Sequence, residues 1–160
     1  MSKSLKRVTA ALRDAGLTSN PVEIGNATTA EMAADLAGCE LDQIAKSIMF
    51  RGLDSGKALL FITAGGNRVD GAGASALAGE ELGKADPALI RAQTGFAIGG
   101  VAPVGHLSPP RAFFDRRLLD FAQVWAAAGT PRHVFPVHPG DLLRVSGARL
   151  ADFTGAQEKM

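Results

Sequence analysis

The chain has 160 residues, 46% of them hydrophobic, and its 17 Lys and Arg residues nearly cancel 16 Asp and Glu residues for a formal net charge of +1. This size and apolar content predict one globular domain over residues 1–160 and argue against a disordered chain, while the near-neutral charge argues against a protein that coats long nucleic acids. The single cysteine excludes an internal disulfide framework and fits a reducing compartment, so we expect a cytoplasmic protein.

The N-terminal segment predicts an amphipathic helix. Leu5, Val8 and Leu12 recur at helical spacing and Gly16 ends the pattern, so the helix is expected to run to about residue 15. Its cations are interleaved with apolar residues and no continuous apolar stretch follows, which argues against a signal peptide. The most apolar run, residues 58–64, is far shorter than the roughly 20 residues that cross a membrane, so no membrane partner is expected.

A helix start signal lies in residues 26–31. Thr28 and Glu31 stand three places apart, as in a capping box, and predict a second helix that ends near Leu36. After a break at Gly38, one more turn leads into a β-rich run, and Lys46 lies at that junction.

Two apolar runs in the middle of the chain predict an antiparallel hairpin. Residues 47–51 and 58–64 flank a cluster of turn residues. Both runs are nearly all apolar rather than alternating, so both faces should be covered and the hairpin should lie in the middle of a sheet. Residues 72–82 and 87–93 predict two short helices beside that sheet.

The second half of the chain begins with a loop and continues with short elements. Residues 94–106 hold four glycines and one proline, a composition typical of a loop with required backbone geometry. The elements expected after it are strands at residues 112–114, 121–125 and 133–137, a helix from Pro139 to about Val145, and an extended piece near 148–153. Without regular β-α-β alternation, these elements favour a single α+β domain: a mixed, mainly antiparallel central sheet flanked by short helices.

Most familiar catalytic motifs are missing from the sequence. It has no P-loop, dinucleotide fingerprint, nucleophile elbow or HExxH, and its three histidines and one cysteine lack metal-ligand spacing. We therefore expect neither a metal nor a cofactor, and we interpret Cys39 as a small buried apolar residue.

Two features remain as candidates for chemistry. Lys46 precedes apolar residues that should be buried, so its stem would be packed and its ammonium group would point toward one end of the sheet; the alternative is an ordinary surface lysine at a strand edge. In the second feature, Gly99 and Gly100 allow close approach of a backbone to a ligand and Pro103 fixes the exit. Exposed N–H groups there would cradle a carbonyl or phosphate oxygen, and the alternative is a plain tight turn.

Both features belong to stretches that resemble a known family. Residues 29–34 (TAEMAA), 43–47 (QIAKS) and 94–105 (TGFAIGGVAPVG) look like the YbaK family, the stand-alone relatives of the editing domain of bacterial prolyl-tRNA synthetase. The resemblance continues through Asp115 and the helix start at Pro139 and covers about residues 5–153. Several separated motifs in the same order make it specific.

The resemblance implies a metal-free trans-editing deacylase that hydrolyses the ester bond of a mischarged tRNA carrying a small amino acid (Ala, Cys, Ser, Thr or 2-aminobutyrate), with tRNA-Pro or a related tRNA as the carrier. The implied partners are the aminoacyl-tRNA acceptor end and an aminoacyl-tRNA synthetase. The family lysine falls on Lys46, the glycine–proline loop on residues 99–103, and the family threonine on Thr29, with either Thr28 or Thr29 facing the pocket. Asp115 matches a recurrent aspartate, whose role stays open.

Ester hydrolysis needs a placed water and donors for the developing oxyanion. No side-chain base stands out, so the loop N–H groups would bind the carbonyl oxygen or the amino acid, Lys46 would bind the terminal phosphate or ribose, and a ribose hydroxyl would help to activate the water. The expected catalytic residues are Lys46, Gly99, Gly100, Val101 and Ala102. The expected substrate-binding residues are Thr28, Thr29, Ile48, Met49, Phe61, Pro103 and Asp115. The candidates for a tRNA-facing rim are Arg68, Arg111, Arg116 and Arg117.

Two other classes of function compete with this hypothesis. A binding module would hold tRNA, another nucleic-acid end or a synthetase in the same cleft without catalysis. A purely structural protein would keep Lys46 and residues 99–103 far apart in space. Whether the lysine and the loop line one cavity therefore separates these alternatives.

Overall fold

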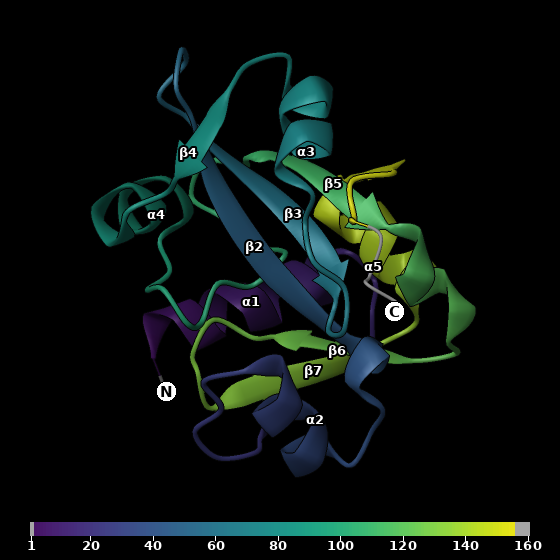
Figure 1. The fold of residues 1–160 in the computed structure, drawn as a ribbon. Helices are drawn as coiled ribbons and strands as arrows, with labels where there is room; N and C mark the ends of the chain where they lie inside the picture. The colour runs from purple at the N-terminus through teal and green to yellow at the C-terminus, as the bar shows by residue number, and fades with distance from the viewer. Residues whose placement is uncertain (1, 156–160) are drawn as a thin grey trace.

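The computed structural model describes residues 2–155, which form a strongly twisted sheet with helices on both faces (Figure 1). The strands of this part of the chain are β1 (Val22–Glu23), β2 (Ile44–Gly52), β3 (Ala58–Ala64), β4 (Leu82–Lys84), β5 (Arg111–Asp115), β6 (Val124–Ala127), β7 (His133–Val137) and β8 (Arg149–Ala151). Its helices are α1 (Lys3–Asp14), α2 (Ala30–Ala37), α3 (Gly71–Ala78), α4 (Pro87–Thr94) and α5 (Pro139–Ser146), with short 3-10 helices η1 (Leu41–Gln43) and η2 (Arg116–Asp120).

The sheet is mixed, as the sequence predicts. Its strand order is β1-β7-β6-β2-β3-β5-β8, and β4 pairs with β2 beside that path. Within the described residues, β2 is antiparallel to β3 and β4, and β7 is antiparallel to β1 and β6. The pairs β2–β6, β3–β5 and β5–β8 are parallel. The predicted α+β architecture with a central sheet flanked by helices is confirmed.

The β2–β3 hairpin lies at the centre of this sheet, and every residue of β3 is buried. Successive residues of β3 point to opposite faces. Leu60 and Ile62 join the larger core cluster with residues of α1, α4 and α5, whereas Phe61 joins a second cluster with residues of α3. Continuous apolarity in the sequence therefore did indicate a strand covered on both sides.

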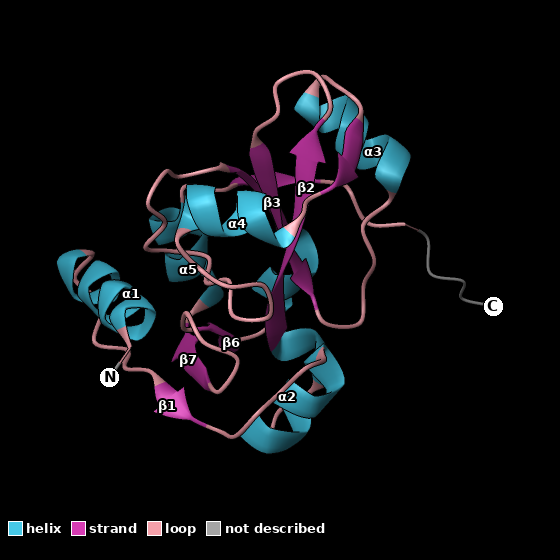
Figure 2. Ribbon diagram, turned by 90° about the vertical axis from the view of Figure 1, so that its left-hand side faces the viewer, coloured by secondary structure: helices cyan, strands magenta, loops and turns pink. Residues whose placement is uncertain are grey.

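Helices occupy both faces of the hairpin. Figure 2 shows α1 and α4 on one side of β2 and β3, and α2 and α3 on the other. The side chains of α1 that enter the core are Leu5, Val8 and Leu12, the three positions that predict this helix from sequence. The small helix α2 covers a separate cluster around Ala33, Ala34 and Ile44.

Several element boundaries differ from those expected. Thr29, not Thr28, is the N-cap of α2, and its side chain accepts a hydrogen bond from Met32 N. The alanine-rich helix expected over residues 72–82 stops at Ala78, because residues 82–84 instead pair with the end of β2 as β4. Likewise, β6 begins only at Val124, and residues 116–120 form η2. In these cases tertiary pairing and local capping override helix or strand propensity.

None of the helices in the described part of the chain has the length and apolar character needed to cross a membrane.

Candidate functional site

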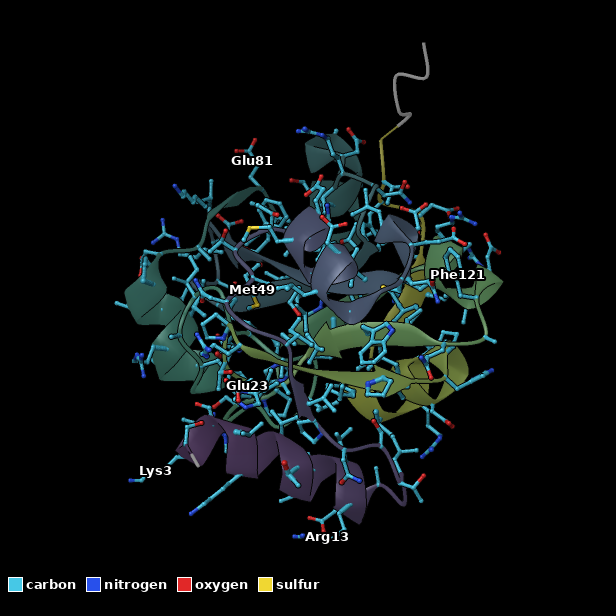
Figure 3. All side chains as sticks on the ribbon, turned by 90° about the horizontal axis from the view of Figure 1, so that it is seen from below. Lys3, Arg13, Glu23, Met49, Glu81 and Phe121 are labelled. Atoms are coloured by element: carbon cyan, nitrogen blue, oxygen red, sulfur yellow. The ribbon has the colours of Figure 1, made fainter. Side chains whose placement is uncertain are left out.

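A cavity of about 430 Å³ lies where α2, β2, the loop after α4, and the β6–β7 turn meet. Lys46, Gly99 and Val101 all line it, so residues about fifty positions apart in sequence border one cavity. Most of the other lining residues are apolar, and Met49 is one of them. Met49, which is labelled in Figure 3, is half-buried and packs against the larger core cluster.

The ammonium group of Lys46 is held by a tight turn. Its Nζ donates a hydrogen bond to the Gly65 carbonyl oxygen at 3.0 Å. Gly65 packs so closely on η1 that an added Cβ would lie 2.2 Å from the Leu41 carbonyl oxygen, so only glycine fits here. Burial lowers the pKa of Lys46 from its ordinary value; nearby Glu31 opposes that shift and Arg68 adds to it. An ammonium group has three N–H donors, and those not used by Gly65 remain for a ligand.

Lys46 also lines a second, more polar cavity of about 590 Å³. Glu31, Asn67 and Arg68 contribute its polar side chains, and Ile48 belongs to both cavities. The lysine therefore stands at the boundary between a mainly apolar chamber and a polar one. A side chain at this boundary can contact a ligand at the point where its apolar part joins its polar part.

The glycine loop contributes fewer groups than the sequence predicts. The Gly100 N–H donates to the Ala97 carbonyl at 3.0 Å and closes a turn, in which Gly99 has φ +92°. Ala102 is fully buried, and its carbonyl oxygen lies 2.7 Å from His106 Nε2. Gly99 and Val101 line the cavity, whereas Gly100, Ala102 and Pro103 do not. The expected cradle is thus reduced to the two residues on either side of Gly100.

Both candidate threonines reach the cavity wall. Thr28 and Thr29 line the 430 Å³ cavity from the chain that leads into α2. The Thr29 hydroxyl oxygen is used as the helix cap, while the Thr28 hydroxyl donates to Met32 Sδ at 3.2 Å.

Besides Pro103, two of the expected substrate-binding residues, Phe61 and Asp115, lie elsewhere. Phe61 is fully buried and lines neither cavity, because its face of the sheet is covered there by α3. Its ring packs against Phe50, Phe113 and Phe153, with centroids 5.0 to 5.6 Å apart.

Asp115 is also buried and also lines neither cavity. Its carboxylate accepts hydrogen bonds from Ala64 N at 3.0 Å, Asn67 Nδ2 at 2.9 Å and Arg117 N at 3.0 Å. It joins the end of β3, the turn after it and the start of η2. Its contacts are structural, although Asn67, one of its partners, lines the second cavity.

Of the four candidate rim arginines, one lines a cavity and the other three do not. Arg68 lines the second cavity. Arg111 donates to the Ala78 carbonyl at the end of α3. Arg116 and Arg117 form ion pairs with acidic side chains, Asp152 for the former and Asp42 and Asp120 for the latter. Of the four, only Arg68 lies beside Lys46.

Sequence reasoning missed four polar residues of the wall: Ser47, Lys84, Thr130 and His133. His133 Nδ1 lies 2.8 Å from the Thr130 hydroxyl, which fixes the orientation of the ring. Nothing in the local sequence signals Lys84, Thr130 or His133, because β4 comes beside β2 only through sheet pairing, and β7 is connected to β2 only through β6. Among the described residues that line the 430 Å³ cavity none is acidic, so its charged groups are cationic and suited to phosphate or ester oxygens. Residues 2–155 contain no group of three or more His, Cys, Asp or Glu side chains placed to hold a metal ion.

Comparison with known proteins identifies a matching family and a similar protein. A family model for the aminoacyl-tRNA editing domain matches residues 25–145. The chain is 30% identical to the uncharacterised protein YwhH of Bacillus subtilis (strain 168) over 125 residues, 78% of this chain and 79% of that protein.

Solved structures match over almost the whole chain. One, described as a candidate trans-editing enzyme for prolyl tRNA synthetase, has a TM-score of 0.90 and 44% identity, covering 98% of this chain and 99% of its own. Another, the protein APE2540, has a TM-score of 0.84 and 25% identity over 93% of this chain and 99% of its own.

Proposed function

Because this chain belongs to the aminoacyl-tRNA editing domain family, we propose that it is a free-standing deacylase that hydrolyses the ester bond of mischarged tRNA carrying a small amino acid. The observation that carries the proposal is that Lys46, Gly99 and Val101 line one cavity. A purely structural protein has no need for a half-buried ammonium group in a cavity wall without carboxylates, and the experiment below separates a deacylase from a module that only binds tRNA.

In this proposal the amino acid enters the apolar cavity and the terminal nucleotide lies toward the polar one. Lys46, at the boundary of the two cavities, contacts the ribose or phosphate next to the ester, and Arg68 contacts the nucleotide from the second cavity. Water adds to the ester carbonyl carbon, the bond to the ribose oxygen breaks, and that oxygen takes up a proton. The cavity wall offers no carboxylate base, so the rate arises from positioning and oxyanion stabilisation, with a ribose hydroxyl orienting the water.

The size of the amino acid is set by the cavity wall. Ala, Cys, Ser, Thr and 2-aminobutyrate are the proposed range, and a pocket of this kind separates neighbours by about 1–3 kcal/mol per methylene. The description of the 44% identical structure supports tRNA-Pro or a related tRNA as the carrier and a synthetase as the partner. The reaction would take place in the cytoplasm, where charged tRNA is used.

The test is a deacylation panel in which tRNA charged with each small amino acid is incubated with the wild type and with Lys46→Ala. We expect the wild type to release at least one amino acid and Lys46→Ala to be slower by about 10²-fold or more, the range for loss of a group that stabilises developing charge. Lys57→Ala, in the exposed turn between β2 and β3, is the matched control and should retain wild-type activity. Full activity in Lys46→Ala would contradict the role of this lysine, and a wild type that binds tRNA but releases nothing would favour the binding module.

A further inference from the structure

The 430 Å³ cavity opens at a gap in the pairing of β2. One edge of β2 pairs with β3 continuously from Ala45 to Arg51. On the other edge, pairing with β6 ends at Ala45 and pairing with β4 begins at Phe50. Residues 46–49 therefore have no strand beside them on that edge within the described chain, although they lie at the centre of the sheet.

The register determines which peptide groups face this gap. In an antiparallel pair, opposite residues alternately exchange both hydrogen bonds or none. Gly52 N donates to the Lys57 carbonyl at 2.9 Å, so Gly52 and Lys57 form a bonded pair. Counting back along β2, Ile48 also bonds to β3, whereas Ser47 directs both its N–H and its C=O to the opposite edge.

Two other contacts support the same alternation of bonded and non-bonded pairs along the hairpin. Ala64 and Ala58 lie opposite residues 45 and 51, which are non-bonded positions by this count. Their N–H groups indeed point away from β2: Ala64 N donates to Asp115 Oδ2 at 3.0 Å, and Ala58 N donates to Gln93 Oε1 at 2.9 Å. The main chain of Ser47 therefore faces the gap between β6 and β4.

The side chain of Ser47 is a second, independent sign of a missing ligand. Its Oγ is buried and has no hydrogen-bond partner among the described residues, and Ser47 itself lines the cavity. Buried polar groups in proteins are nearly always paired, so an orphaned hydroxyl in a cavity wall marks a place for a polar ligand atom. With no acidic side chain in that wall, an amino group that enters the cavity has only neutral acceptors available.

We propose that Ser47 binds the aminoacyl group through its main chain, as if that group were one residue of an added strand. The Ser47 N–H donates to the carbonyl oxygen of the amino acid, and the Ser47 C=O accepts from its α-amino group. This is the reciprocal pattern of a bonded antiparallel pair, and the Ser47 hydroxyl provides another acceptor. The inference rests on the proposed deacylase function and extends it: the substrate class is an α-aminoacyl ester with a free amino group.

Amide hydrogen exchange followed by NMR tests the geometry in the free protein. The Ser47 amide should exchange at least about tenfold faster than the Ile48 amide, because only the latter is bonded to β3. Equal protection of the two amides would overturn the assignment of Ser47 to the gap.

Binding is tested with two stable analogues, 3′-amino-3′-deoxyadenosine carrying an alanyl or a propionyl group in amide linkage. They differ only in the α-amino group. The alanyl analogue should bind at least about tenfold more tightly, the effect of a hydrogen bond that involves a charged group, and should slow exchange at Ser47 but not at Ile48. Binding of both analogues with equal affinity, or binding without protection of Ser47, would overturn the inference.

The deacylation panel separates the two proposals. If the wild type hydrolyses mischarged tRNA but the Ser47 amide does not respond to the alanyl analogue, only the inference about Ser47 fails. If the wild type neither hydrolyses any tRNA of the panel nor binds either analogue, the proposed function fails and the inference falls with it.

Discussion

Substitution of Gly100 by alanine tests whether the loop after α4 forms part of the cavity wall. An added Cβ would lie 2.8 Å from both Cα and C of Thr130. Since both are backbone atoms, the contact cannot be relieved by a side-chain rotation. The loop or the β6–β7 turn must move instead, and overpacking of this kind costs about 1–3 kcal/mol.

The same movement should displace Gly99 and Val101 relative to Lys46. Small misplacements of catalytic groups cost up to about 10²-fold in rate, so we expect kcat/KM of Gly100→Ala to fall by about tenfold to a hundredfold. Gly147→Ala is the control, because Gly147 has φ +69° and no neighbouring atom within 4 Å. It should lose about 1–2 kcal/mol through backbone strain alone and retain wild-type kcat/KM.

Urea unfolding followed by circular dichroism gives the stability of both variants, and initial rates of deacylation give the kinetics. Loss of activity in Gly100→Ala but not in Gly147→Ala, at comparable loss of stability, would support the loop as a cavity wall. Wild-type stability and activity in Gly100→Ala would refute the contact with Thr130 and the reasoning built on it.

Three further predictions follow from the same contacts. Asp115→Ala leaves buried N–H groups without an acceptor and should lower the free energy of unfolding, measured with urea, by about 2–4 kcal/mol. The activity of the folded fraction should stay at the wild-type level. A selective loss of activity would instead support a substrate-binding role for Asp115. Ser47→Ala removes an orphaned hydroxyl, so its melting temperature should equal or exceed that of the wild type, and a clear decrease would mean that the hydroxyl is paired in solution. Arg68→Ala should raise KM for charged tRNA by about tenfold, the effect of one charge-assisted hydrogen bond, whereas Arg111→Ala should leave KM unchanged; steady-state kinetics at fixed salt distinguish the two.

The central hairpin and α1 could be predicted because their signals are local. A continuous apolar run gives the same two-sided burial wherever it lies in the sheet, and Leu5, Val8 and Leu12 define one helix face without reference to the rest of the chain. The position of Lys46 in a strand could also be predicted, because the apolar residues after it in β2 indicate a strand.

The rest of the site depends on contacts that sequence does not encode locally. Phe61 lies opposite Ile48 in the hairpin, and both side chains are on one face, yet Ile48 reaches the cavity and Phe61 does not. The difference arises from the neighbouring strands: one edge of β2 is unpaired beside Ile48, whereas Phe61 lies on β3 between β2 and β5. Similarly, the gap beside Ser47 exists because β6 and β4 stop at different points along β2, and neither endpoint can be read from the residues of β2.

The cavity wall contributed by α2 and the chain before it is built largely from alanines: Ala27, Ala30 and Ala33. These residues belong to the smallest of the three core clusters, apart from the two that surround the hairpin. A larger side chain at any of them would reduce the volume of the cavity, by about one methylene for each carbon added, without repacking the centre of the molecule. Substitutions at these alanines could therefore change which amino acid the cavity accepts during evolution, while the two larger core clusters stay as they are.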